Sequence, residues 1–375
     1  MSQINFMPNK QPSAIILAPY LGVHRDVTQE ISNGKTTTAS DKFQVKPIIE
    51  SLRSLNYKAS AISLNKNYQL RDINELNRPD ICFISKLRSY GTKNPDEYAM
   101  FHQSCVLNLK RKGTKIATLY SDHLAPEDSP DGELYRNLLF LSDAIISPSS
   151  ILIGHAKQWS RQNTLTAIIK DPCLIPKQPF NRLSLNDACK VLWFGSNSNI
   201  KYLRSTLSPL LMNSPGERRF QFTFLAAADG LTEIKTILSK INISSNWGFR
   251  LIKWKHNEQP KQLTDELGEA HITFIPSDPF DPRKSGVSHN RLTDSIQSGC
   301  IAVASPMDSY RELSKVSLIG DNLSQLFNKA VTEHGRLCKK YNSLRAAYLQ
   351  PFQPENNQEN WARAIKSICS IEHSF

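Results

Sequence analysis

The feature that most constrains the fold is a strand, loop, helix and strand pattern in residues 271–306. Two apolar, β-branched runs, His271 to Ile275 and Cys300 to Ala304, are typical of buried strands. Between them, Ser288 can cap a helix that Gly299 ends. Since strands that alternate with helices form parallel sheets, this stretch predicts an α/β fold.

The helix in this stretch has two different faces. At 100° per residue, Asn290, Arg291 and Asp294 fall on one arc of about 100°, whereas Leu292 and Ile296 lie opposite. The apolar face is expected to pack against the core, and the polar face is available to bind a ligand.

Basic residues stand where this helix begins. Lys284 and Ser285 come just before it and Arg291 lies in its first turn, where free backbone N–H groups and fixed cations together suit a diphosphate. Asp294, one turn further, can accept hydrogen bonds from ribose hydroxyls. The alternative is that Arg291 and Asp294 form only an exposed helical ion pair, worth about 0.3 kcal/mol.

The composition is that of an ordinary globular protein. A chain of 375 residues exceeds one core and predicts two domains of about 150 to 200 residues. No apolar run approaches the roughly 18 residues that span a bilayer, and the first dozen residues do not resemble a secretory signal. We therefore expect a cytoplasmic protein.

The charge favours anionic partners. Lys and Arg number 46 against 34 Asp and Glu, a net charge of +12 that suits sugar nucleotides, nucleic acid or a lipid surface. No RNA-binding signature, helix-turn-helix pattern or basic tail is present, so nucleic acid is not expected. The basic run from Lys110 to Lys112 fits a helix end, or a peripheral contact with an anionic membrane. The seven cysteines show no zinc spacing, and no metal site is expected.

The strand and helix rhythm breaks once, which places the domain boundary. Prolines and polar residues interrupt it between Asp171 and Lys190. We predict an N-terminal Rossmann-like domain at 1–172, a linker at 173–189, a C-terminal Rossmann-like domain at 190–350, and a final helix at 351–375 that packs back toward the first domain.

Candidate residues follow several predicted strands. In an open parallel sheet, ligands bind beyond the carboxyl ends of the strands. Asp122 and His123 follow the strand Lys115 to Tyr120 and can orient an acceptor hydroxyl or remove its proton. Gly195 and Asn197 follow the strand Val191 to Phe194. Ordinary loop polarity explains Asp122 and His123 equally well, and any tight strand-to-helix turn uses residues such as Gly195 and Asn197.

The second half resembles the donor-binding domain of glycosyltransferases with the two-Rossmann GT-B architecture, and especially the retaining group 1 family. The resemblance covers roughly residues 190 to 345. The similar segments are the strand and turn Val191 to Gly195, Trp254 before a helix, the strand Ile272 to Pro276, and the turn and strand Ser298 to Pro306.

The resemblance implies roles for residues of the opening stretch. The family often has two glutamates separated by seven residues, and these positions correspond here to Gly286 and Asp294. The second acid, which binds the donor ribose in the family, is thus conservatively replaced, and the first, near the donor sugar, is missing. Lys284 and Arg291 look like the residues that hold the nucleotide diphosphate. The first half is similar only in layout, a strand with a Gly22 loop and a long helix, so no catalytic residue carries over there.

These observations predict a metal-independent, retaining glycosyltransferase whose two doubly wound domains face each other across a cleft. The donor is a nucleotide-activated sugar, used as substrate rather than cofactor, and the acceptor is a glycan, a lipid-linked molecule or a small molecule. The alternatives are a sugar-nucleotide epimerase of the same plan and a catalytically silent binding module, which the missing acid at Gly286 would suit.

Overall fold

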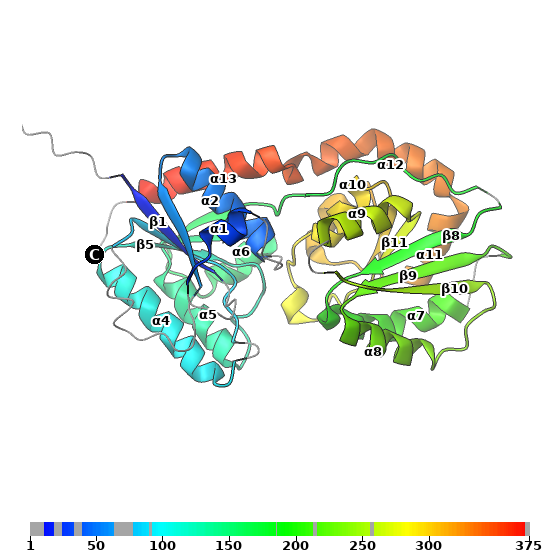
Figure 1. Ribbon diagram of the computed structural model, residues 1–375, viewed down its shortest axis with the longest axis horizontal. Helices are drawn as coiled ribbons and strands as arrows, with labels where there is room; N and C mark the ends of the chain where they lie inside the picture. The colour runs from blue at the N-terminus through cyan, green and yellow to red at the C-terminus, as the bar shows by residue number, and fades with distance from the viewer. Residues whose placement is uncertain are drawn as a thin grey trace, which may run out of the picture. The chain divides into compact units, whose positions relative to one another are not determined.

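The structure is a computed structural model. It describes residues 11–18, 25–33, 40–63, 78–89, 92–184, 186–212, 216–255 and 259–371. Gly22 lies outside these ranges. The chain divides into two compact units: unit 1 comprises residues 1–169 and 357–375, and unit 2 comprises residues 170–356. Each unit is an α/β domain with helices against a central sheet (Figure 1).

Unit 1 contains a sheet of seven strands in the order β2-β3-β1-β4-β5-β6-β7. All neighbours are parallel except β2, which pairs antiparallel with β3. The strands are β1 (Ser13–Ala18), β2 (Arg25–Asp26), β3 (Lys58–Ser63), β4 (Ile81–Ile84), β5 (Lys115–Leu119), β6 (Ala144–Ser147) and β7 (Leu165–Ile168). The helical segments are α1 (Thr28–Ser32), η1 (Asp41–Val45), α2 (Lys46–Ser54), α4 (Pro95–Arg111), α5 (Pro130–Leu141), α6 (Ser150–Lys157) and α13 (Pro354–Cys369), the last from residue 357 on.

Unit 2 contains a parallel sheet of six strands in the order β10-β9-β8-β11-β12-β13. The strands are β8 (Cys189–Phe194), β9 (Phe220–Ala226), β10 (Trp247–Lys253), β11 (Ile272–Ile275), β12 (Ile301–Ala304) and β13 (Leu318–Ile319). The α-helices are α7 (Leu203–Met212), α8 (Ala228–Leu238), α9 (Gln259–Glu269), α10 (Asn290–Gln297), α11 (Leu323–Thr332) and α12 (His334–Leu349). Shorter turns are η2 (Asn197–Tyr202), η4 (Pro282–Lys284), η5 (Asp308–Leu313) and η6 (Gln350–Phe352).

Both faces of each sheet are buried, as the continuous apolar runs of the strands require. In β8, Val191 and Trp193 belong to one core cluster with α7 and α11, while Leu192 and Phe194 belong to another with α9 and α10. This alternation confirms the doubly wound α/β fold that the sequence predicts.

Unit 1 is completed by a segment from the far end of the chain. Trp361, Ile365 and Ile368 of α13 lie in the same core cluster as Ile16 of β1. Trp361 is 2% exposed, and its ring meets the Phe83 ring edge-on with centroids 6.3 Å apart. The helix at the end of the sequence is therefore part of the core of unit 1.

Residues 173–189 are more than a connection. Cys173 and Ile175 are buried in a core cluster of unit 2, and Phe180 and Leu183 pack against another. The prolines of this segment interrupt regular structure, yet most of its large apolar side chains pack against unit 2, and Leu174 is exposed.

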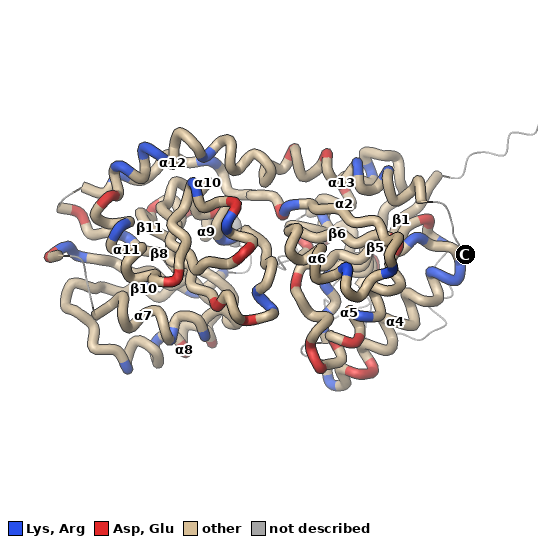
Figure 2. The backbone as a smooth tube through the Cα atoms, turned by 180° about the vertical axis from the view of Figure 1, so that it is seen from behind, with Lys and Arg blue, Asp and Glu red and all other residues tan. Residues whose placement is uncertain are grey.

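Basic and acidic residues are interspersed over both units (Figure 2). Within the described residues, none of the helices is both long and apolar enough to cross a membrane.

Candidate functional site

The loops after β8 and β11 meet at the carboxyl edge of the unit 2 sheet. Lys284, in the single turn η4, donates from Nζ to Asn199 Oδ1 at 2.9 Å. Asn199 is 8% exposed and is itself held through Nδ2 by Ser196 Oγ at 3.1 Å. The structure thus brings Lys284, predicted to bind phosphate, against the loop that contains Gly195 and Asn197.

A buried tyrosine supports this arrangement. The Tyr202 hydroxyl donates to Asp281 Oδ2 at 2.7 Å, and Lys201 Nζ contacts the same oxygen at 2.6 Å. Asp281 Oδ1 in turn accepts from the Arg283 N–H at 3.0 Å and so caps the turn that carries Lys284. Lys284 Nζ also lies 5.7 Å from the centroid of the Tyr202 ring, within range of a cation–π interaction.

The ionisation of this pair is set by the surroundings. Burial, and next the hydrogen bond to Asp281, raise the pKa of Tyr202, so its hydroxyl remains a donor. Burial raises the pKa of Asp281, but the hydrogen bonds from Lys201 and Tyr202 lower it further, and the net shift is downward. Asp281 is therefore a fixed negative charge paired with Lys201.

Arg291 has a buried donor for which the described residues supply no partner. Its positive charge is also the smallest of the effects on the pKa of Tyr202, and it opposes the rise. Among the described residues, Arg291 NH1 is buried and meets no hydrogen-bond acceptor. A buried guanidinium nitrogen is costly to leave unsatisfied, and an anionic ligand would satisfy it.

The other two residues of the predicted polar face of α10, Asn290 and Asp294, contact the segment that enters unit 2. Asn290 Nδ2 donates to Asp171 Oδ2 at 3.2 Å, and the Cys173 thiol donates to Asp294 Oδ1 at 3.4 Å. Asn290 and Asp294 are one turn apart, so they share the side on which this segment packs. Their predicted roles toward the donor stay predictions.

Asp294 is 6% exposed. Burial raises its pKa to about 7, and the hydrogen bond from Cys173 offsets only part of that rise. The carboxyl group is therefore close to half-protonated at neutral pH, unlike an exposed aspartate.

The start of α10 differs from the prediction. His289, not Ser288, occupies the N-cap position, and Ser288 Oγ is buried without a hydrogen-bond partner within the described part of the chain. His289 is fixed there because its Nε2 donates to Ser309 O at 2.5 Å and contacts Glu312. Lys170 Nζ reaches the same glutamate at 2.5 Å.

Ser285 and Gly286 link η4 to α10. The Ser285 N–H donates to Pro282 O at 3.1 Å and closes the turn. Gly286 has a φ of 75°, in the left-handed region that favours glycine. The backbone conformation therefore accounts for glycine at the position that corresponds to the missing acid.

Gly195 and Asn197 both lie in the β8 loop but differ in their contacts. A Cβ on Gly195 would lie 3.4 Å from Asn199 Nδ2, close to the residue that binds Lys284. Asn197 Nδ2 donates to Asp229 Oδ2 at 2.6 Å, and a Cβ on Gly230 would lie only 2.3 Å from Asn197 Oδ1. Asn197 thus packs tightly against the start of α8.

In unit 1, Asp122 lies at the carboxyl edge of the sheet in a double ion pair. Its Oδ2 contacts Lys86 Nζ and, at 2.7 Å, Arg88 NH2. Burial raises the pKa of Asp122, but the two cations together lower it further, and the net shift is downward. A carboxylate held in this way is a weak base, which disfavours proton removal as its role.

His123 is buried beside two aromatic partners. It is 7% exposed, its Nδ1 lies 2.8 Å from the Tyr120 hydroxyl, and its ring stacks on His155 with centroids 3.9 Å apart. Burial, and next the charge of His155, lower the pKa of His123 to about 4, so the ring is neutral at pH 7.

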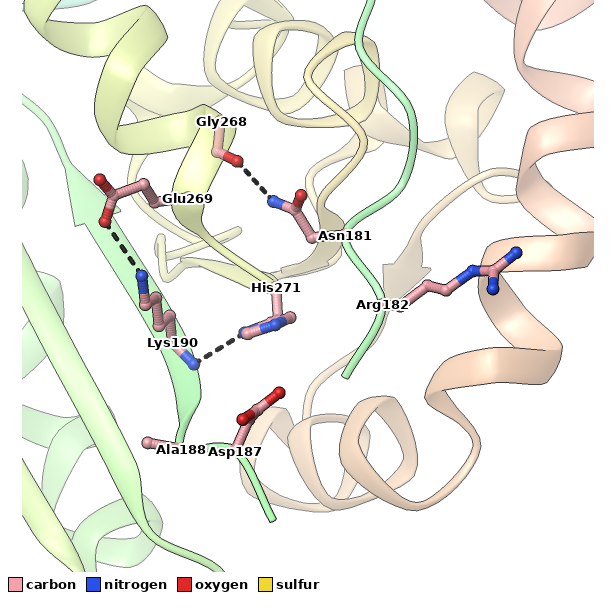
Figure 3. A pocket seen from close by; sticks show the side chains of 8 residues that line it. All are labelled: Asn181, Arg182, Asp187, Ala188, Lys190, Gly268, Glu269 and His271. Carbon is pink, nitrogen blue, oxygen red and sulfur yellow. Dashed lines mark hydrogen bonds and ion pairs between the residues drawn. The ribbon is translucent and has the colours of Figure 1, made fainter. Parts of the chain in front are cut away.

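A separate pocket of about 470 Å³ opens at the amino ends of β8 and β11 (Figure 3). Some of its polar groups pair with one another: Lys190 Nζ meets Glu269 at 3.1 Å, and the Lys190 N–H donates to His271 Nδ1 at 3.0 Å. Since it lies at the opposite sheet edge from Lys284, it is not part of the candidate donor site. The described residues contain no group of three His, Cys, Asp or Glu side chains placed to hold a metal ion.

Solved structures share this fold over nearly their whole length. HepE of Anabaena, in complex with UDP-glucose, is 11% identical, covers 95% of this chain and 99% of its own, and has a TM-score of 0.62. A glycosyltransferase from Rickettsia africae ESF-5 is 11% identical, with coverage of 96% and 100% and a TM-score of 0.62. The fold is that of the GT-B glycosyltransferases.

The GT-B fold is not limited to one reaction among these neighbours. A structure from Listeria monocytogenes, assigned as a UDP-N-acetylglucosamine 2-epimerase, is 11% identical, with coverage of 97% and 98% and a TM-score of 0.54. No protein family model matches the sequence, and no curated protein sequence is similar to it. The activity must therefore be argued from the site.

Proposed function

We propose that this GT-B chain is a glycosyltransferase that binds a nucleotide-activated sugar in unit 2 and transfers the sugar to an acceptor hydroxyl. The observation that carries the proposal is that Arg291 NH1 is buried and meets no hydrogen-bond acceptor among the described residues, in the helix that follows Lys284 and its contact with Tyr202. Two cations at the carboxyl edge of a parallel sheet, with backbone N–H groups at the start of α10, suit a diphosphate.

The chemistry follows from the charge of the leaving group. As the bond from the sugar to the diphosphate breaks, negative charge grows on the departing oxygen. Lys284 and Arg291 stabilise this charge, while Asn199 and Tyr202 keep the lysine in place before the donor binds. Hydrogen-bonding groups of the protein that are already oriented avoid the cost of reorganisation during the reaction.

Asp294 and Asn290 are proposed to bind the donor ribose. Their present contacts are with Cys173 and Asp171, and a thiol is a weak donor that a ribose hydroxyl can replace. Ser285, Gly195 and Asn197 are proposed to line the phosphate site from the two loops.

On the acceptor side, the acceptor is proposed to be a glycan, a lipid-linked molecule or a small molecule. We propose that His123 hydrogen-bonds a substrate oxygen as a neutral ring and that Asp122 orients Lys86 and Arg88. A cytoplasmic location and a peripheral membrane contact remain part of the proposal.

Metal independence and retention of configuration are proposed together with this mechanism. Lys284 and Arg291 would supply the positive charge that a metal supplies in other transferases. Transfer that persists in a chelator, and a product whose anomeric coupling in NMR matches that of the donor, are the expected results.

The test is thermal unfolding with UDP, GDP, ADP and CMP and their sugar conjugates. A nucleotide at 100 times its Kd stabilises the fold by about 2.7 kcal/mol, seen as a raised Tm. Lys284→Ala and Arg291→Ala are each expected to weaken the binding of that nucleotide roughly 10- to 100-fold, which corresponds to the loss of a hydrogen bond to a charged group.

Arg204→Ala is the matched control, because Arg204 lies on α7 of the same unit and pairs with Glu233 at 2.8 Å. It should bind nucleotide like the wild type. Absence of any nucleotide-induced shift in the wild type would refute the proposal. Conversion of the donor into an isomeric sugar nucleotide, without transfer, would establish the epimerase alternative.

A further inference from the structure

Two cations converge on one carboxylate oxygen at the carboxyl edge of the unit 1 sheet. Lys86 and Arg88 follow β4, and Asp122 follows the neighbouring parallel strand β5. Lys86 Nζ and Arg88 NH2 both contact Asp122 Oδ2, the latter at 2.7 Å. The edge where these residues meet is the one at which parallel sheets bind ligands.

The cations are more exposed than the acids that hold them. The side chains of Lys86 and Arg88 are 34% and 32% exposed, against 19% for Asp122. Asp131, which also acts on Arg88, is 8% exposed and accepts from the Ser89 N–H at 2.8 Å. The acidic charge therefore lies deeper, and the accessible surface of the cluster is positive.

The neighbouring histidine adds a donor rather than an acceptor. The Tyr120 oxygen accepts from the backbone N–H of Ala125, at 3.3 Å, and of Leu124. Its own proton is then directed to His123 Nδ1, 2.8 Å away. A neutral ring that accepts at Nδ1 has its proton on Nε2. Lysine, arginine and this imidazole thus offer hydrogen-bond donors.

A second cluster, in which two cations also contact one aspartate, has a purely structural role. At the amino edge of the same sheet, Lys110 and Arg161 contact Asp143 Oδ1 at 2.8 and 2.9 Å. There Arg161 also donates to the backbone O of Ser142, and Asp143 Oδ2 accepts from the Ile116 N–H. The cluster ties strands and loops together, and it lies away from the ligand edge.

We infer that Lys86 and Arg88 bind an anionic group of the acceptor, a phosphate or a carboxylate. The inference rests on the proposed function and names the acceptor class: a sugar or glycan that carries such a group. Asp122 keeps the two cations side by side before the acceptor binds, and the arginine provides the planar set of donors that matches either anion.

The experiment compares three sugars that differ in charge: glucose 6-phosphate, glucuronate and glucose. Binding to the full-length protein is measured by calorimetry at constant ionic strength. The donor site is saturated with the nucleoside diphosphate that raises the Tm of the protein. The wild type should bind one or both anionic sugars and bind glucose at least about tenfold more weakly. The stronger of the two anionic sugars identifies phosphate or carboxylate as the group recognised.

The variants are Lys86→Gln and Arg88→Gln, each of which leaves the other cation on Asp122. Each should weaken the anionic sugar about tenfold or more and leave nucleotide binding unchanged. Lys110→Gln is the matched control at the other sheet edge and should behave as the wild type. If a single variant folds poorly, the double variant Lys86→Gln/Asp122→Asn removes a cation without leaving an unpaired carboxylate.

Two results would overturn the inference: anionic sugars that bind the wild type no better than glucose, or anion binding that both variants retain in full. Failure of the proposed function is recognised separately, since the wild type would then show no nucleotide-induced shift. In that case the sugar titration is made in the Lys284→Ala background, which removes a competing anion contact in unit 2.

Discussion

Replacing Tyr202 with phenylalanine tests whether the phosphate site is organised in advance. Tyr202→Phe removes only the hydroxyl that donates to Asp281 at 2.7 Å, while the ring beneath Lys284 remains. Asp281 keeps its contacts with Lys201 and with the Arg283 N–H. The change should loosen the turn η4 without removing a group that touches the donor.

The size of the effect follows from the contacts that remain. A hydrogen bond to a charged group contributes about 1.5 to 3 kcal/mol, and Asp281 retains two other donors. We therefore expect about half of the lower value, roughly 0.7 kcal/mol, to be lost from the positioning of Lys284. This corresponds to about threefold weaker binding of a nucleoside diphosphate.

Calorimetry with a nucleoside diphosphate and with its parent nucleoside separates positioning from general damage. The diphosphate should bind Tyr202→Phe about threefold more weakly, whereas the nucleoside, which lacks the phosphates, should bind as before. Tyr341→Phe is the control, because Tyr341 is a buried tyrosine of the unit 2 core, 2% exposed, on α12.

A double-mutant cycle with Lys284→Ala decides the mechanism. If Tyr202 acts through Lys284, its substitution should have no further effect once the lysine is gone. Equal losses for nucleoside and diphosphate, or a loss that persists in the Lys284→Ala background, would show that the reasoning is wrong.

Two further predictions concern stability. Burial raises the pKa of Asp294 from the ordinary aspartate range to about 7, so the folded state binds the proton more tightly than the unfolded state does. Stability should therefore fall as pH rises from about 4 to 7 and level off above that. Over that pH range the free energy of unfolding should fall by about 4 kcal/mol. Urea unfolding of Asp294→Asn should show no such fall, and a pH profile identical to that of the wild type would contradict the raised pKa of Asp294. Trp361→Ala should destabilise unit 1 by about 3 to 5 kcal/mol, because it leaves a cavity against Phe83; denaturant unfolding measures it, and a loss below 1 kcal/mol would mean that α13 contributes little to that core.

The fold was predictable because the central strands of the two sheets repeat the same local pattern. The apolar runs of β8, β11 and β12 are buried on both faces, and such runs are the signature of a parallel sheet. The end of helix α4 was equally readable, since the basic run from Lys110 to Lys112 is followed by Gly113, which has a φ of 82°. The start of α10 was not, because His289 is fixed by contacts with residues 20 or more positions away.

Residues of the candidate site were predictable from the sequence only where they lie in one continuous segment. Lys284 and Arg291 lie in a single segment, so the sequence placed both at one sheet edge. Tyr202 and Asp281 are 79 residues apart, and neither motif nor periodicity linked them. A polar arc of about 100° on a helix can face two neighbours at once. Helical periodicity therefore did not separate Arg291 from Asp294, whose partner Cys173 lies 121 residues earlier.

The partner of Asp122 could likewise not be predicted from the sequence. Its position after a strand was readable, but its partner Arg88 lies 34 residues earlier, after a different strand. The sequence thus suggested a base where the structure contains an ion pair.

The division of the chain also bears on the order in which the protein can fold. Unit 2 is continuous in sequence, whereas the core of unit 1 contains side chains from both ends of the chain. During synthesis, the ribosome therefore releases a first domain that lacks α13 and then the whole of the second domain. Until Trp361 and Ile365 emerge, the part of this core that they cover, around Phe83, remains exposed, and a chaperone that binds apolar surface would find its target there.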